Sequence, residues 1–101
     1  MKQIITQLSK EEKSLIKILN RTCHIDIFYD FGKEVHFITF EYFSNEYEIE
    51  YDKTENHYNF NMITEYEEFR GKLEAKTTTL KYDCSFKVIK NLIKALITEE
   101  K

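Results

Sequence analysis

Apolar and polar residues alternate along the chain from about Cys23 to Met62, and this alternation limits the fold more than any other feature of the sequence. A period of two is typical of strands that bury one face and expose the other to water. Short polar segments interrupt the pattern, so strands are predicted at about Cys23 to Phe31, Val35 to Phe43, Tyr47 to Asp52 and Tyr58 to Met62. Strands that follow one another through short turns pair as an antiparallel meander.

The second of these strands carries apolar residues on both of its faces. Val35 and Phe37 have one parity, whereas Ile38, Phe40 and Tyr42 have the other. A strand with two apolar faces is either central in its sheet or contains a β-bulge, here near Phe37, that exchanges the faces. The pattern leaves both interpretations open.

Two amphipathic helices are predicted, one on each side of the strands. The first begins at Ser9, which forms a capping box with Glu12. Ile4, Ile5 and Leu8 either extend this helix backwards or form a short extended arm. The second begins after Ser85, a favourable N-cap residue. Its apolar stripe, which is expected to pack on the sheet, consists of Phe86, Val88, Ile89, Leu92, Ile93, Leu96 and Ile97.

The segment from Thr64 to Tyr82 has two interpretations. Thr64 and Glu67 have the spacing of a second capping box, which predicts a helix that carries Tyr66, Phe69 and Leu73 on one face. Alternatively, the fourth strand continues to Arg70 and Gly71 marks a hairpin. We favour the helix here, followed by a strand-like stretch from Thr77 to Tyr82.

These elements predict a single α+β domain over residues 1–101, in which an antiparallel meander of about four strands packs against N- and C-terminal amphipathic helices. The chain has no apolar run of about 18 residues that could span a membrane, and no apolar run of signal-peptide length near Met1. We therefore expect Cys23 and Cys84 to be reduced thiols in the cytoplasm.

No motif for catalysis or metal binding stands out. The residues considered as ligands or nucleophiles are Cys23, His24, His36, His57 and Cys84. They lack the short paired spacing of structural zinc sites, and no local motif joins a cysteine to a histidine. Carboxylates two residues apart, such as Glu48 and Glu50, also occur routinely on solvated sheet faces. We therefore predict no catalytic residue, no metal and no cofactor, with an unrecognised Cys/His or carboxylate site as the alternative.

Charge is distributed unevenly along the chain. Residues 41–74 contain ten acidic and three basic residues, a net charge of −7, whereas residues 75–101 contain six basic and three acidic residues, a net charge of +3. An acidic middle argues against direct binding to nucleic acid, which favours basic surfaces. The residues predicted to contact a partner are Glu46, Glu48, Glu50, Asp52, Glu41, Tyr42 and Tyr58. Tyrosine is enriched at interfaces, but an acidic row on a strand can also serve only to prevent aggregation.

The function indicated by these features is protein binding without catalysis. An acidic surface suits contact with the basic groove of a nucleic-acid-handling protein, which the chain would inhibit by competing with nucleic acid. In size and charge, the chain is similar in type to small acidic α+β proteins of phages and mobile elements, anti-CRISPR inhibitors among them, although no motif aligns. The alternative is a small homodimeric accessory or immunity protein that uses its aromatic sheet as an interface.

Overall fold

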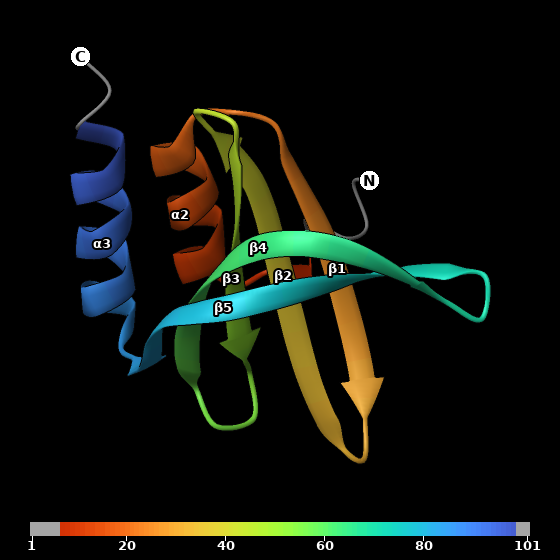
Figure 1. Ribbon diagram of the computed structural model, residues 1–101. Helices are drawn as coiled ribbons and strands as arrows, with labels where there is room; N and C mark the ends of the chain where they lie inside the picture. Colours follow the sequence, from red (N-terminus) through yellow and green to blue (C-terminus); the bar gives the residue numbers. More distant parts are fainter. Residues whose placement is uncertain (1–6, 99–101) are drawn as a thin grey trace.

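The fold is an antiparallel sheet with two helices against one of its faces, as seen in a computed structural model that describes residues 7–98 (Figure 1). The elements are α2 (Lys10–Leu19), β1 (Cys23–Asp30), β2 (Lys33–Tyr42), β3 (Asn45–Asp52), β4 (His57–Phe69), β5 (Lys72–Cys84) and α3 (Phe86–Thr98). The sheet has five strands in the order β1-β2-β3-β4-β5, which is their order in the chain. The α+β class and the meander are confirmed, with one strand more than the sequence indicated.

Helix α2 begins at the predicted capping box. The Ser9 hydroxyl accepts the Glu12 backbone N–H at 3.1 Å, and the Glu12 carboxylate accepts the Ser9 backbone N–H at 2.9 Å. The helix ends at Asn20, which adopts a left-handed conformation with φ of 51°. Of the three residues predicted to extend this helix or form an arm, Ile4 and Ile5 lie outside the described residues, and Leu8 is buried just before the cap at Ser9.

The core lies between the helices and one face of the sheet. Residues that are paired across strands form its central row, which is Ile25, Ile38, Ile49 and Phe60. The helices cover this row with side chains that have no exposed surface, namely Leu15, Leu19, Ile89 and Ile93. All of these sheet residues have the parity that points toward the helices, and the residues between them form the opposite face, which we call the open face.

Strand β2 is central and has no bulge. Its pairing with β1 and with β3 is continuous, from Cys23↔Phe40 to Asp30↔Lys33 on one side and from Val35↔Asp52 to Tyr42↔Asn45 on the other. The apolar residues on its second face belong to the open face, where Phe37 contacts Phe28 of β1 edge to face at 5.5 Å between ring centroids. The central-strand interpretation is therefore right, and the bulge near Phe37 is wrong.

Strands β4 and β5 form a long hairpin where we favoured a helix. The prediction of a helix after Thr64 is wrong, because this segment pairs with the following one, as in Tyr66↔Ala75 and Glu67↔Glu74. Arg70 and Gly71 make the turn, with φ of 52° and 78°. Register shifts between Tyr58 and Phe60 and between Ile63 and Glu65 bend the hairpin. Its distal part, residues 64–79, which we call the arm, crosses in front of β1–β3 (Figure 1).

Among the described residues, neither α2 nor α3 is long and apolar enough to cross a membrane. Both cysteines of the chain are free thiols.

Candidate binding groove on the open face of the sheet

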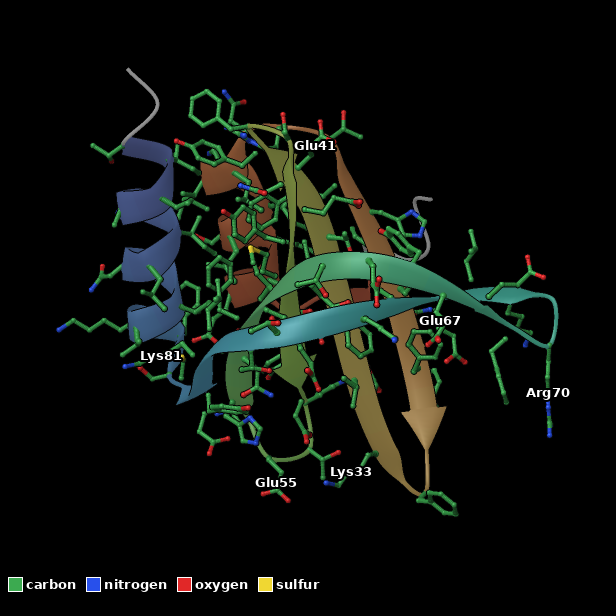
Figure 2. All side chains as sticks on the ribbon, viewed as in Figure 1. Lys33, Glu41, Glu55, Glu67, Arg70 and Lys81 are labelled. Carbon is green, nitrogen blue, oxygen red and sulfur yellow. The ribbon has the colours of Figure 1, made fainter. Side chains whose placement is uncertain are left out.

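The arm and the open face enclose a groove of about 1150 Å³. Strands β1, β2 and β3 supply its floor, and residues Ile63 and Tyr66 of β4 with 72–75 and Thr77 of β5 supply its wall. The bend of the hairpin creates the groove, since a flat β4–β5 extension would leave β1–β3 uncovered. In Figure 2, Glu41 marks one end of the open face, whereas Glu67 and Arg70 mark the arm and its tip.

Carboxylates dominate the charge of the groove. Those that line it are Asp26, Glu46, Glu48, Glu50 and Glu74, against the cationic Lys72 and the imidazole of His24. Three of the carboxylates come from alternate positions of β3, and Asp26 comes from β1 on the same face. The structure thus brings together three of the predicted contact residues in one concave surface.

Glu48 is the carboxylate most affected by its surroundings. Burial raises its pKa, a hydrogen bond from the Asn61 amide opposes this shift, and the negative charges of Glu50 and Asp26 raise the pKa further. The Asn61 Nδ2 donates to Glu48 at 3.0 Å and to Glu50 at 3.3 Å. One neutral amide therefore holds two carboxylates that repel each other, and a cation between them would be favourable.

The end of the open face beside the groove adds a further like-charge contact. Glu41 of β2 is paired directly with Glu46 of β3. Like charges at directly opposed positions destabilise a sheet. The same Glu46 accepts a hydrogen bond from the Tyr66 hydroxyl at 2.8 Å, which ties the arm to the sheet. Burial raises the pKa of Tyr66, and the hydrogen bond to Glu46 adds to this shift.

Large apolar side chains line the same groove and remain exposed. Phe28 and Leu73 are 55% and 73% exposed. Phe28 lies on β1, and Leu73 lies on the arm. Exposed apolar surface beside charged residues commonly marks an interaction site.

Four of the residues predicted to contact a partner lie outside the groove. Tyr42 and Tyr58 are only 5% and 1% exposed and belong to the core under the helices, so the prediction that they contribute to the acidic surface needs correction. Asp52 is also buried, and its carboxylate holds the β3–β4 turn by accepting the Glu55 backbone N–H at 3.0 Å. Glu41 is exposed on the open face.

Sequence reasoning missed several residues of the groove. Asp26, Phe28, Leu73 and Glu74 were not among the predicted contact residues. The alternation of β1 carried a usable signal for Asp26, because it places this residue and His24 on the polar face. Leu73 and Glu74 could not be found in this way, because a helix was favoured for this segment and a helix would not place them beside β1–β3.

A second polar cluster lies on the other side of the sheet, under α2. The Nδ1 atom of the buried His36 lies 2.7 Å from the carboxylate of the buried Glu12, and its Nε2 atom lies 2.5 Å from the carboxylate of Glu34. A ring with an N–H on each nitrogen can donate to both carboxylates at once. Hydrogen bonding to His36 lowers the pKa of Glu34, and the nearby positive charge of Lys53 supports this shift. This cluster joins α2 to β2, and none of its residues lines the groove.

The cysteines show no arrangement that would activate a thiol. The Cys23 thiol contacts the Arg21 carbonyl, and the Cys84 thiol contacts the Tyr82 carbonyl. Burial raises the pKa of both thiols, whereas reactive cysteines have a lowered pKa. Within residues 7–98, no group of three or more His, Cys, Asp or Glu side chains is placed to hold a metal ion.

Comparison of the chain with protein-family models, with curated proteins and with solved structures yields no match.

Proposed function

We propose that this chain is a non-catalytic binding protein whose acidic groove takes a basic segment of another protein. The concentration of carboxylates in a concave, partly apolar site is the observation that carries the proposal. Carboxylates that serve only to keep a protein soluble are most effective when they are fully hydrated and far apart. Here Glu46, Glu48 and Glu50 are half-buried, and the pKa of Glu48 is raised.

The electrostatics favour a cationic ligand. Glu50 and Asp26 both repel Glu48, and a lysine or arginine placed among them would offset that cost. The exposed ring of Phe28 suits the same ligand, since aromatic faces attract cations and pack against their aliphatic stems. Nucleic acid itself would be repelled by this face.

The biological role that we propose is inhibition of a nucleic-acid-handling protein. Such proteins use basic surfaces to hold phosphates, and an acidic groove that binds one of their basic segments would compete with the nucleic acid. The association should be fast at low salt and should weaken as ionic strength rises.

Affinity purification from the native host or from infected cells, with mass spectrometry, would identify the partner. The variant that tests the site is Glu48→Gln with Glu50→Gln, which keeps shape and removes two charges. Glu46 is left intact because it holds Tyr66 of the arm. The matched control is Glu65→Gln with Glu67→Gln, which removes two charges at the same spacing on the arm, where both residues contact Lys76 instead of the groove.

We expect the groove variant to weaken binding of the identified partner at least about tenfold at low salt, because two close charge pairs are lost. The control should bind like the unmodified protein. Equal affinity of the groove variant and the control would show that the groove is not the contact surface.

A homodimer is the second candidate, favoured by apolar side chains outside the groove. Tyr82 of β5 is 69% exposed and Phe69 of the arm is 57% exposed. Size-exclusion chromatography with light scattering tests this candidate. A mass that stays at 12.3 kDa up to high protein concentration would eliminate it.

A further inference from the structure

We infer that the partner's basic segment binds as an extended strand added to the free edge of β5. This inference rests on the proposed function and specifies how the ligand lies in the groove. It combines three observations: an unpaired strand edge, the residues of β5 that line the groove, and the carboxylates opposite that edge.

The edge of β5 is open in the described part of the chain. Strand β5 has one neighbour, β4, because it is the last strand of the sheet. It is 13 residues long, and its pairing with β4 is regular from Glu65↔Lys76 to Phe69↔Lys72. Alternate residues of such an edge strand direct their N–H and C=O groups away from the sheet, ready to pair with another chain.

This edge borders the groove. Residues that line the groove from β5 include the consecutive run Lys72, Leu73, Glu74 and Ala75. Successive side chains of a strand point to opposite faces, so a single face of β5 would contribute only every second residue. Leu73 and Ala75 share the face of the hairpin that carries Tyr66, so the additional lining by Lys72 and Glu74 indicates that the groove extends to the backbone of β5. A strand added there would also be shielded by the open face of the sheet.

The floor of the groove determines which side chains the added strand should carry. Every second side chain of that strand would point toward the floor, where Asp26, Glu48 and Glu50 lie. Lysine or arginine at these positions would meet the carboxylates.

The apolar residues of the groove fit the rest of such a ligand. Phe28, Phe37 and Leu73 line the groove together with the carboxylates. They can cover the aliphatic stems of lysine and arginine, which bury their carbon chains while the charged group reaches an acid. Backbone pairing would supply affinity, and the alternating basic side chains would supply specificity, as in other cases of strand addition.

The test uses a synthetic peptide of about eight alternating lysine and valine residues, capped at both ends, a length that covers residues 72–77. Two further peptides carry N-methyl groups on every second backbone nitrogen, one on the lysines and one on the valines. Methylation removes hydrogen-bond donors and keeps the charge. Affinity is measured by fluorescence anisotropy, and amide exchange of β5 is measured by NMR, with β1, the other edge strand, as the internal control.

We expect the unmodified peptide to bind and to slow exchange at alternate amides of β5, with no change along the free edge of β1. One of the N-methylated peptides should bind at least about tenfold more weakly, which corresponds to about 1.4 kcal/mol. The other should bind as the parent does, because its methyl groups point away from β5.

The inference is overturned if the parent peptide fails to bind, if both N-methylated peptides bind as well as the parent, or if protection appears on β1. It is also overturned if β5 becomes protected on concentration of the protein alone, which would identify a second copy as the occupant. If the peptide test fails but the Glu48→Gln, Glu50→Gln variant still loses partner binding, the acidic groove remains the contact surface. Only the proposal that the ligand adds as a strand to β5 is then refuted.

Discussion

The buried ion cluster under α2 allows a quantitative prediction, made by changing Glu12 to Gln. The side chain of Glu12 has no exposed surface, and it has two tasks. One oxygen completes the capping box at Ser9, and the other accepts from His36 at 2.7 Å. Glutamine can preserve the cap, because its amide oxygen still accepts the backbone N–H. The substitution therefore removes one charge and leaves the buried His36 ring with the Glu34 carboxylate alone.

The expected cost is large for a chain of this size. Breaking a buried ion pair by removal of one partner costs about 3–5 kcal/mol, because a buried charge loses its compensation. Glu34 still contacts His36, so the lower end, about 3 kcal/mol, is expected for Glu12→Gln. This is a large part of a total stability of about 5–15 kcal/mol. In thermal unfolding, it would lower Tm by roughly 12–24 °C.

Urea unfolding of four proteins measures this effect: the unmodified chain, Glu12→Gln, His36→Leu and the double variant. Without the His36 side chain, Glu12→Gln should cost much less, with a coupling energy of about 1.5 kcal/mol or more. The neighbouring Glu11→Gln is the control, because Glu11 is exposed and its contact with the Tyr58 hydroxyl can be kept by an amide oxygen. If Glu12→Gln costs the same in both backgrounds, the argument that charge pairing holds α2 to β2 is refuted.

Three further predictions concern the groove and its pH dependence. Glu48→Gln should stabilise the fold by about 0.5 kcal/mol at neutral pH, since burial and like charge disfavour the ionised carboxylate; the gain in urea unfolding should vanish as pH falls and Glu48 becomes protonated. Because the pKa of Glu34 is lowered in the fold, the Glu34 carboxylate takes up a proton more readily in the unfolded chain. The ionised Glu34 therefore stabilises the fold above the ordinary pKa of 4.5, and this stabilisation is lost as the pH falls below that value. Unfolding curves of Glu34→Gln at different pH values should lack that part of the acid sensitivity. Tyr66→Phe should leave overall stability within about 0.5 kcal/mol but speed amide exchange along residues 64–79, because the tie to Glu46 is lost; unchanged exchange would show that this contact does not hold the arm.

The part of the sheet that could be predicted from the sequence is β1–β3, where apolar and polar residues alternate within each strand. Alternation in β1–β3 places each side chain on the core or on the open face, and the register agrees with this placement. Parity also carried the information that separates Tyr42 from Glu41, because consecutive residues of a strand point to opposite faces. The prediction grouped them by proximity in the chain, and the buried tyrosines show why parity is the better guide.

The arm could not be predicted in the same way. Thr64 and Glu67 satisfy a capping-box spacing, yet that signal is outweighed by pairing with residues beyond the turn at Gly71, a tertiary effect. The groove depends on the bends at Tyr58–Phe60 and Ile63–Glu65, which no local rule specifies. The buried cluster had a signal of its own: His36 has the same parity as Ile38 and Phe40, so a polar residue was due to face the core. Its partner Glu12, 24 residues away, was recognisable only as a cap.

The strands lie in the sheet in the same order as in the chain, and this has a consequence for how the protein folds. Every strand pairs with the strand that precedes or follows it, so each hairpin can form as soon as its second strand is available. Loop closure between neighbouring segments has a small entropic cost, and chains dominated by such contacts fold quickly. Helix α3 is the exception, since it completes the core by packing on α2 from the opposite end of the chain. Folding of this molecule should therefore consist of rapid hairpin formation and a slower final docking of residues 86–98.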